Sequence, residues 1–586
     1  MKRIGFLRAG MPACLFGLGV AVAACGGTDN AGIGSDPDAG AGGDGAVNVD
    51  GGGGNDGSGG GDGGVTDGGG DGGGGDGGVG DAADGGVVMG PGTYVSGIVG
   101  LDTNPGTKAL PVKTISKGIT NAVALGGTPN VYVAQGHYPE KVALVEGISV
   151  LGGYQCDMNS CTWVRDRVVY DTAIDMQDNE GVLAGASITK RTTLDGFRLR
   201  GKTGAANAGV VACLTLDGGS PTVTNNVVSP GDVTGNARAI GIQVIAPTVD
   251  QTGALIDSNA IQGGTSTLRW IGISFDFKQG APAGASVAVV SNNRIRGGAA
   301  QFTTGIAAAS CGATTTFFKN DILAGTSTAP GAGNGTSWAI EAFGSKATYD
   351  SNSLNADQAN TGTCSSSALC GGFASYSSTS ILTNNVIVGV KGPRTTGLLL
   401  SEAELAAGVI VANGNYIDGA GSGPLVSAQS LSSAIQLRNC NGGNCGVNTI
   451  IGKIRNNILM GGLNTLRYGV YEEQLAGKTC HPQAFEYNDI FFSAQANRVD
   501  TLYHFWNNAT ATDLATTALI VSTVPTNPAP TNLYNVDPQV NATRNLVTPG
   551  SPMIDKGTAT EAPPKDIDGD TRPRGNAVDI GADEAM

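Results

Sequence analysis

Carboxylates that could carry out acid–base chemistry are sparse in this 586-residue chain, because only 14% of its residues are charged. Hydrolysis of a glycosidic bond needs two carboxyl groups roughly 5–10 Å apart. Asp257 and Asp350 occupy equivalent positions of a repeat but stand three repeats apart, roughly 14 Å if repeats stack as strands. A polysaccharide lyase or hydrolase is therefore an alternative hypothesis rather than the leading one. A second column has one acid and runs Val211, Gln243, Ser274, Ala307, Glu341, Ala374, Leu399, Gln436 and Tyr471.

The charged residues are densest near the end of the repeats, where Arg455 and Glu486 occupy equivalent positions of adjacent repeats. We interpret this pair as an exposed salt bridge, which adds little stability. We expect His137 and His504 to be packed or exposed neutral residues rather than catalytic ones. The other charged residues of this region are Arg438, Glu472 and Glu473.

The residue pattern predicts no bound cofactor, with calcium as the one alternative. Asp566, Asp568 and Asp570 resemble a calcium-binding loop, but Thr571 stands at its sixth position, where glycine is needed. We therefore expect a structural turn there. The Gly/Asp-rich stretch near the amino terminus lacks the regularly placed apolar residue of calcium-binding nonapeptides.

Eleven cysteines are present, and Cys14 and Cys25 lie in or next to the amino-terminal apolar segment. Six of the other nine form three close pairs, which in an exported protein indicate local disulfides rather than zinc ligands. Cys213, Cys311 and Cys480 remain, so either one thiol is free or long-range pairing replaces a local disulfide. The close pairs are Cys156–Cys161, Cys364–Cys370 and Cys440–Cys445.

These residues are positioned by a repeat that recurs every 27 to 42 residues from about residue 190 onward. Each copy has an apolar residue, two variable residues, an asparagine, one variable residue and an aliphatic residue. Phe197 fits a further copy without the asparagine. The asparagines of the nine complete copies are Asn226, Asn259, Asn293, Asn320, Asn352, Asn385, Asn415, Asn457 and Asn488.

The columns of this repeat predict an all-β solenoid, a parallel β-helix of about ten or more coils. All nine residues two positions after the asparagine are aliphatic, from Val228 to Ile490. A small-apolar unit, from Gly209-Val210 to Gly469-Val470, alternates with the first. A near-constant period with loops of variable length indicates a solenoid, and short β-branched segments indicate strands. We expect aliphatic stacks inside and a ladder of asparagine amides in the turns.

The amino terminus has the features of an export signal. A basic start and a short apolar run end in small residues, which predicts a signal peptide rather than a membrane span. Val22-Ala23-Ala24-Cys25 resembles the lipobox of bacterial lipoproteins, in which the cysteine receives a lipid and becomes the new amino terminus. The alternative is an ordinary secretory signal. Residues 26–90 bury too little apolar surface to fold, so we predict a disordered tether spanning roughly 45 Å.

The start of the folded region resembles a bacterial family. Pro111-Val112-Lys113-Thr114-Ile115, followed by Gly136-His137-Tyr138, resembles a domain-of-unknown-function family that begins many bacterial parallel β-helix proteins. The resemblance implies an amphipathic capping helix over the first coil, and the apolar spacing agrees with one buried face. The residues of that face are Ile115, Ile119, Ala122 and Val123.

The end of the chain resembles the carboxy-terminal region of choice-of-anchor Q proteins. The matching segments are residues 550–557, 566–573 and 579–584, which read GSPMIDKG, DIDGDTRP and DIGADE. Together the two resemblances imply a right-handed, pectate-lyase-like parallel β-helix, a fold often found on surfaces in carbohydrate-related roles. They imply no particular reaction.

We predict that the protein is exported and lipid-anchored in the bacterial cell envelope, at the outer membrane or cell surface. The charge-poor outer columns favour a monomeric, non-catalytic module that binds extracellular glycan or matrix or acts as a spacer. An adhesin-like protein binder is the second alternative, and nucleic acid is disfavoured because no basic stripe is present. Trp163, Trp270, Trp338 and Trp506 are the candidates for stacking on sugar rings.

The predicted domain organisation has five segments. Residues 1–24 are the signal peptide, 25–90 the lipidated cysteine and linker, 91–170 the cap and first coils, 171–500 the repeats, and 501–586 the last coils and end cap.

Overall fold

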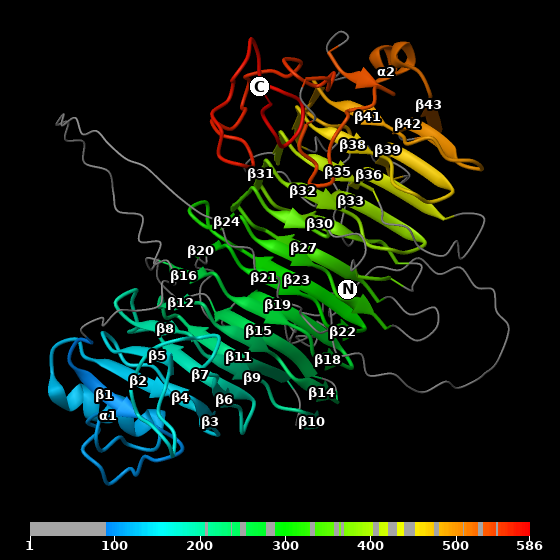
Figure 1. The fold of residues 1–586 in the computed structure, drawn as a ribbon. Coiled ribbons are helices and arrows are strands. Elements are labelled where there is room, and N and C mark those ends of the chain that lie inside the picture. The colour runs from blue at the N-terminus through cyan, green and yellow to red at the C-terminus, as the bar shows by residue number, and fades with distance from the viewer. Residues whose placement is uncertain are drawn as a thin grey trace, which may run out of the picture. The chain divides into compact units, whose positions relative to one another are not determined.

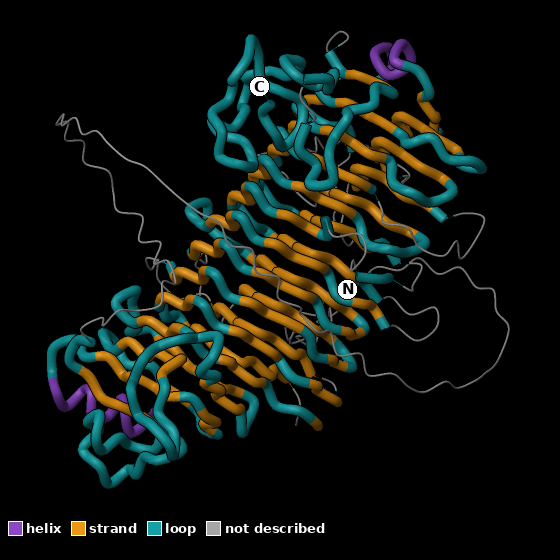
Figure 2. Tube along the Cα trace, in the orientation of Figure 1, coloured by secondary structure: helices purple, strands orange, loops and turns teal. Residues whose placement is uncertain are grey.

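The computed structural model describes residues 89–585 except for several loops, so Cys25, Cys440 and Cys445 lie outside the described residues. Within the described part, the chain forms a parallel β-helix built on three 13-stranded sheets, with a fourth, five-stranded sheet beside them (Figures 1 and 2). No described helix is long and apolar enough to cross a membrane. The loops left out are 206–208, 236, 246–252, 277–286, 329–334, 357–361, 365–367, 402–409, 420–429, 439–451, 474–479, 508, 525–530 and 547–548.

Sheet A contains the strands that lead into the asparagine turn, and its strands pair in parallel. They are short because the turn follows after three to six residues in each coil. In order they are β1 (Gly92–Val95), β2 (Asn130–Ala134), β5 (Ser149–Tyr154), β8 (Thr193–Asp195), β12 (Thr222–Thr224), β16 (Ala254–Asp257), β20 (Ala288–Ser291), β24 (Thr316–Phe318), β28 (Thr348–Asp350), β31 (Ile381–Thr383), β34 (Val411–Asn413), β37 (Lys453–Arg455) and β40 (Ala484–Glu486).

Sheet B follows the asparagine turn and is also parallel. The predicted aliphatic column from Val228 to Ile490 lies in these strands, in register and buried in the core. The strands are β3 (Gly136–Tyr138), β6 (Thr172–Asp175), β9 (Arg198–Arg200), β13 (Val227–Ser229), β17 (Ala260–Gln262), β21 (Arg294–Arg296), β25 (Asp321–Leu323), β29 (Ser353–Leu354), β32 (Val386–Val388), β35 (Tyr416–Asp418), β38 (Ile458–Met460), β41 (Asp489–Phe491) and β44 (Leu533–Tyr534).

Sheet C has the longest strands and carries the small-apolar unit. It is parallel except at its last strand, β43, which pairs antiparallel with β42. The strands are β4 (Val142–Ala143), β7 (Glu180–Gly185), β11 (Gly209–Asp217), β15 (Ala237–Ile245), β19 (Arg269–Asp276), β23 (Phe302–Ala309), β27 (Ser337–Phe343), β30 (Cys370–Tyr376), β33 (Arg394–Ser401), β36 (Leu431–Arg438), β39 (Leu466–Glu472), β42 (Val499–Trp506) and β43 (Ala511–Leu514).

The fourth sheet lies in the middle coils, between the strands of sheets B and C along the chain. Its strands are β10 (Gly204–Ala205), β14 (Asp232–Thr234), β18 (Thr265–Ser266), β22 (Ala299–Ala300) and β26 (Thr326–Ser327). The predicted alignment of the small-apolar unit is wrong in one coil. Gly209 pairs with Ala237, whereas Leu214 and Thr215 pair with Ile242 and Gln243, so Thr215 rather than Val211 begins the outer column.

The two ends of the β-helix carry its helices, α1 (Ile115–Leu125) and α2 (Thr517–Thr523) (Figure 2). The predicted capping helix is confirmed: the Thr114 hydroxyl accepts the Lys117 N–H, and Ile115, Ile119 and Ala122 are buried. The prediction for Val123 is wrong, because its side chain is 51% exposed and Gly118 occupies the buried face instead.

The turn between sheets A and B contains a continuous ladder of asparagine amides. In each step, the Oδ1 of one asparagine accepts the backbone N–H and the Nδ2–H of the asparagine one coil earlier, as for Asn352 and Asn320 at 3.0 and 2.9 Å. The remaining Nδ2–H donates to a backbone carbonyl, that of Val290 for Asn320. All nine predicted asparagines lie in this ladder and are buried. At its start, the Phe197 N–H donates to Asn226.

Two features of the turn were not predicted. The ladder has a tenth amide, Asn532, whose Oδ1 accepts the Asn488 N–H at 2.8 Å. The residue before each of the nine predicted asparagines is left-handed, with φ of 53° at Asn292 and 51° at Lys319. A single left-handed residue redirects the chain from sheet A to sheet B, and asparagine tolerates this conformation better than most residues. Asparagine accordingly recurs at this position at 225, 292, 384 and 456.

Candidate binding face on sheet C

The outer face of sheet C carries a mixed column of polar and apolar side chains that the coils bring into register. Alternate residues of these strands face the core, as Ile242 and Ile273 do, so the residues between them face outward. Apart from its first member, the predicted outer column is confirmed by the strand pairing. It runs Thr215, Gln243, Ser274, Ala307, Glu341, Ala374, Leu399, Gln436, Tyr471 and His504.

Arginine–carboxylate pairs cross this face diagonally. Arg269 donates to Glu341 at 2.6 Å and to the Thr304 hydroxyl at 3.2 Å, and that hydroxyl also contacts Glu341. The Arg269 and Glu341 side chains are 15% and 6% exposed, so this pair is held in place within the face. In the neighbouring coils, Gln243 donates to Asp276 at 2.8 Å.

A second group of charges lies on the later coils. Arg438 and Arg394 both pair with Glu473, the latter at 3.7 Å. Like Arg269, Arg394 begins its strand and reaches a carboxylate two coils further on. The two groups therefore repeat one arrangement at two places along the sheet.

Aromatic rings stand between and beyond these charged groups. Phe343 and Tyr376 stack with centroids 4.8 Å apart, and Tyr471 stacks on His504 at 4.6 Å. His504 also contacts Asp513 at 2.6 Å. Desolvation by burial raises the pKa of Tyr376, and Glu341 raises it further, so this phenol stays protonated and able to donate.

Several buried polar atoms on this face have no hydrogen-bond partner among the described residues. Folded proteins pair the large majority of buried polar atoms, so such atoms call for an explanation. Gln436 is fully buried, yet neither its amide nitrogen nor its amide oxygen is paired. The others on this face are Thr215 Oγ1, Ser274 Oγ, Ser401 Oγ and Arg269 Nε.

A polar cavity of about 390 Å³ lies beside the first strands of the same sheet. Glu180 and Val210, on β7 and β11, belong to sheet C itself, and Lys141 pairs with Glu180. The cavity extends the polar face toward the start of the β-helix. Its lining residues are Lys141, Asp178, Asn179, Glu180, Lys202 and Val210.

Asp217 and Asp276 share one outward column two coils apart, roughly 10 Å between Cα atoms, whereas Glu341 lies farther from both Asp276 and Glu473. Glu341 and Glu473 lie four coils apart, which is roughly 19 Å at the spacing of neighbouring strands. Asp276 and Glu341 lie two coils and two residues apart, roughly 12 Å between Cα atoms. Glycoside hydrolases need their carboxyl groups within roughly 10 Å.

No protein-family model and no curated protein matches this sequence. Solved structures similar to it include pectate lyase Pel9A, with 12% identity, a TM-score of 0.32, and coverage of 86% of this chain and 98% of that one. The A-module of the Azotobacter vinelandii mannuronan C-5 epimerase AlgE4 has 12% identity and a TM-score of 0.30, covering 70% and 99%. XylC in complex with xylose has 9% identity and a TM-score of 0.31, covering 68% and 74%.

The four tryptophans named as candidates for stacking on sugar rings do not form an exposed platform. Trp163, Trp270, Trp338 and Trp506 are all buried, with exposed fractions of 3%, 0%, 1% and 8%. Trp338 does stand on the outer face of sheet C, but it packs with Leu369 and Leu399. Trp270 lies in the core, and its indole N–H donates to the Gly263 carbonyl at 2.6 Å.

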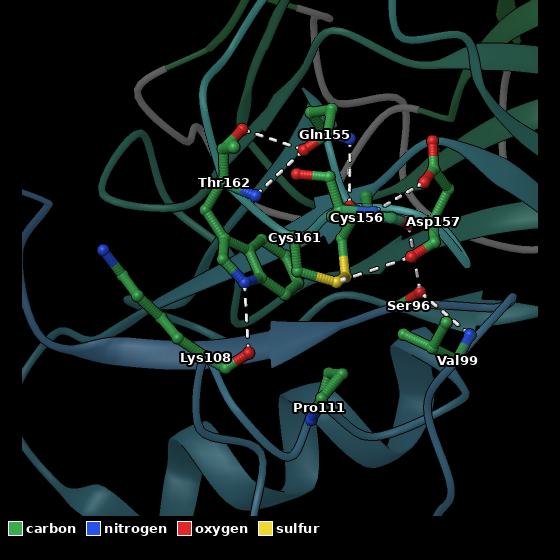
Figure 3. Close-up of a disulfide and its surroundings, with 12 residues drawn as sticks. Ser96, Val99, Lys108, Pro111, Gln155, Cys156, Asp157, Cys161 and Thr162 are labelled. Atoms are coloured by element: carbon green, nitrogen blue, oxygen red, sulfur yellow. Dashed lines mark hydrogen bonds between the residues drawn. A yellow bond between two sulfur atoms is a disulfide. The ribbon is translucent and has the colours of Figure 1, made fainter.

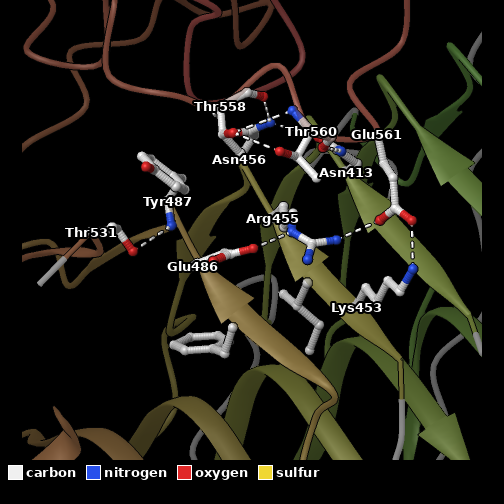
Figure 4. A network of polar contacts seen from close by, with 12 residues as sticks. Asn413, Lys453, Arg455, Asn456, Glu486, Tyr487, Thr531, Thr558, Thr560 and Glu561 are labelled. Carbon is white, nitrogen blue, oxygen red and sulfur yellow. Dashed lines mark hydrogen bonds and ion pairs between the residues drawn. The ribbon is translucent and has the colours of Figure 1, made fainter. Parts of the chain in front are cut away.

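The Arg455–Glu486 pair forms as predicted, but it is not exposed. The two side chains are only 12% and 17% exposed, because the C-terminal segment lies over them (Figure 4). Glu561 of that segment also pairs with Arg455 and with Lys453, the latter at 2.5 Å. This cluster therefore fastens the C-terminal segment and lies away from the face of sheet C.

Two of the three predicted disulfides are present, and the third lies outside the described residues. Cys156–Cys161 closes a loop beside Trp163, whose indole donates to the Lys108 carbonyl at 3.2 Å (Figure 3). Cys364–Cys370 closes the second. The three other described cysteines are buried without disulfides, and burial raises the pKa of their thiols. They are Cys213, Cys311 and Cys480.

The remaining predicted residues have structural surroundings. The Asp566 carboxylate accepts the backbone N–H groups of Asp568, Gly569 and Asp570 at 2.7–3.0 Å, which forms a turn. His137 is exposed and contacts Asp175 at 2.8 Å. Among the described residues, no three His, Cys, Asp or Glu side chains are arranged to hold a metal ion.

Sequence reasoning missed the Arg269–Glu341 pair and the unpaired Gln436. The outer column predicted from the sequence contained Glu341 and Gln436. Arg269 was missed because it lies five residues before Ser274 and therefore belongs to another column. The contact spans 72 residues and crosses two coils diagonally. A signal was present: Arg269 and Arg394 both stand at the start of a sheet C strand.

Proposed function

We propose that the outer face of sheet C binds an extended, neutral polysaccharide and leaves it chemically unchanged. The observation that carries this proposal is the set of unpaired, buried polar atoms on that face. They include hydroxyls and an amide, which can both donate and accept. Sugar hydroxyls have the same double capacity. Because Gln436 and Ser274 are 0% and 1% exposed, a polysaccharide would complete these hydrogen bonds only after displacing the groups that cover them.

The charge balance of the face supports a neutral ligand. Each of its arginines already pairs with a carboxylate of the same face, so little positive charge is left for a polyanion. A polyuronate would have to displace Asp276, Glu341 or Glu473 from these pairs. The arginines concerned are Arg238, Arg269, Arg394 and Arg438.

The spacing of carboxylates supports binding without catalysis. Glu341 contacts Arg269 and Thr304, and Glu473 contacts Arg394 and Arg438, so each is engaged in a local contact. Their separation exceeds that of a hydrolytic pair, so Glu341 and Glu473 do not form such a pair with each other. A lyase or hydrolase remains the competing function, and an adhesin-like protein binder the third.

The test is binding of the full chain to arrays of neutral and acidic polysaccharides, together with a depolymerisation assay. We expect binding to neutral polysaccharides and no release of oligosaccharides. The double variant Gln436→Leu, Ser274→Ala should weaken binding about tenfold, the loss expected for one or two neutral hydrogen bonds. Arg296→Ala, on the outer face of sheet B, is the matched control and should bind as the wild type does.

Each other result overturns the proposal in a different way. Release of unsaturated or reducing oligosaccharides would establish the enzymatic alternative. Binding to no polysaccharide would favour a spacer or a protein-binding module. Binding that Gln436→Leu, Ser274→Ala leaves intact would place the ligand elsewhere on the molecule.

We also propose that Cys25 carries the lipid and that residues 26–90 tether the β-helix to the envelope. The small residues before Cys25 and the Gly/Asp-rich composition after it support this proposal. Metabolic labelling with an alkyne fatty acid should label the wild type and Cys14→Ala but not Cys25→Ala. Label that persists in Cys25→Ala would refute the anchor.

A further inference from the structure

The C-terminal segment, residues 535–585 after β44, lies against the outer face of sheet B over its last coils (Figure 1). Val386, Tyr416 and Ile458 occupy one outward column of that sheet and are buried, whereas Arg294 of an earlier coil in the same column is exposed. Met553 and Ile580 of the segment pack against this column and form a hydrophobic cluster separate from the main core. The segment thus covers one side of the coils.

Polar contacts fasten the same segment along the edge of the asparagine turn (Figure 4). Asn456 exchanges two hydrogen bonds with Thr558, both of 2.8 Å. Asn413 donates to the Thr560 carbonyl at 3.1 Å. These contacts are satisfied and neutral, so they hold the segment without depending on pH.

Asp489 lies beneath this segment and, unlike the contacts just described, its side chain has unpaired polar atoms. It follows Ile458 in the same outward column and pairs with Leu533 of β44, the strand that precedes the segment. Its side chain is fully buried, and neither carboxylate oxygen has a hydrogen-bond partner among the described residues. Burial of an ionised carboxylate without a partner is costly, whereas the protonated acid is neutral and far cheaper to bury.

We propose that the C-terminal segment is a proton-dependent clasp, closed on sheet B while Asp489 is protonated and weakened when Asp489 ionises. The proposal concerns the outer face of sheet B and is independent of the ligand proposed for sheet C.

Of the charged groups in this region, Asp537 is the one that acts on Asp489, and it favours the neutral form. Asp537, from the segment itself, adds a second negative charge. Arg544 of the segment lies over the Tyr416 ring, 5.4 Å from its centroid, and Asp418 is on the same strand as that tyrosine. The Val536 N–H acts in the opposite direction, although its geometry falls short of a hydrogen bond.

Burial, with a smaller contribution from Asp537, raises the pKa of Asp489 to about 8. Asp579 and Asp583 in the segment have pKa values raised by burial to about 6. A carboxyl group whose pKa is raised in the closed state stabilises that state most below its ordinary pKa of about 3.9. This stabilisation is lost as pH rises through the raised value, so the clasp weakens from mildly acidic pH to about pH 8.

The experiment is hydrogen–deuterium exchange of the full chain between pH 6 and pH 9, corrected for intrinsic base catalysis. In the wild type, protection of residues 549–585 should fall at least about tenfold, since one pKa unit corresponds to a factor of ten in the opening equilibrium. In Asp489→Asn, which is neutral at every pH, the fall above pH 7 should disappear. Asp321→Asn, in the same outward column but away from the segment, is the matched control and should behave as the wild type.

A second variant and further measurements test whether an altered pH dependence results from misfolding of the variant. Asp489→Leu should also keep the segment protected at pH 9, and circular dichroism should show that both variants retain their strands. Opening in the wild type should expose the apolar column and increase binding of an apolar dye at pH 9. Equal protection at pH 6 and pH 9 in the wild type, or an unchanged pH dependence in both variants, would overturn the clasp.

Discussion

The asparagine turn and the outer face of sheet C bury polar side chains in columns along the same coils, with opposite outcomes. In the turn, Asn352 and its neighbours use each donor and acceptor of their amides. On sheet C, Gln436 has the same amide group, is equally buried, and pairs neither end of it. A regular column with complete hydrogen bonding indicates a structural role. A buried column with unpaired polar atoms indicates a face whose hydrogen bonds are not completed within the fold.

The largest effect expected from this contrast is in Asn352→Ala. The change removes donations to Phe317 and Asn385 and the acceptor for Asn320, all of them buried. Each unsatisfied buried group costs about 1–3 kcal/mol, so the free energy of unfolding should fall by about 4 kcal/mol in urea titrations. Asn159→Ala, in an exposed loop, should change it by less than about 0.5 kcal/mol. A decrease of less than about 1 kcal/mol in the free energy of unfolding of Asn352→Ala would contradict a structural role for the ladder.

A change of opposite sign is expected in Gln436→Leu. Because the amide is buried and unpaired, an apolar side chain of similar size should raise the free energy of unfolding by about 1–2 kcal/mol. Gln243→Leu is the matched control in the same column: its amide donates to Asp276, so this variant should be destabilised. If thermal denaturation shows both glutamine variants destabilised alike, the two regions do not differ in the way proposed.

The fold was largely predictable because residues that make the same contacts recur in many repeats of the sequence. Val228 and Asn226 each have equivalents in the eight later predicted copies. Nine identical or similar residues at one position make the pattern clear even where a single coil departs from it. Asn532 was missed because its coil carries β43 and α2 in addition to the regular strand β42, which stretches the spacing from Asn488 to 44 residues. The alignment of Gly209 failed because Cys213 occupies the small-residue position there, opposite Gly241.

The candidate face was less predictable, because its properties come from contacts that do not repeat. The sequence suggested tryptophans as a platform, but Leu369 and Leu399 cover Trp338. The Arg455–Glu486 pair follows from adjacent positions, yet its cover comes from Glu561, 106 residues away. Single long-range contacts of this kind leave no periodic signal.

The smallest expected effect tests the left-handed residue that separates the two regions within each coil. Lys319 adopts φ of 51° where four other coils have asparagine. Lys319→Asn should therefore raise the free energy of unfolding by about 0.5 kcal/mol, since asparagine tolerates this conformation better. Lys346→Asn, at an exposed position outside the left-handed region, should bring no such gain. A decrease in Lys319→Asn, measured by urea titration, would show that its side-chain contacts outweigh the backbone term.

The ladder also bears on how such a chain can change in length over evolution. Asn320 and Asn352 occupy identical positions 32 residues apart. Deletion of one such unit would bring Asn352 next to Asn293, with the same amide contacts re-formed, and duplication of a unit would extend the ladder without altering its neighbours. Recombination between coils is therefore expected to yield chains that still fold, so the length of the outer face of sheet C can change in whole coils.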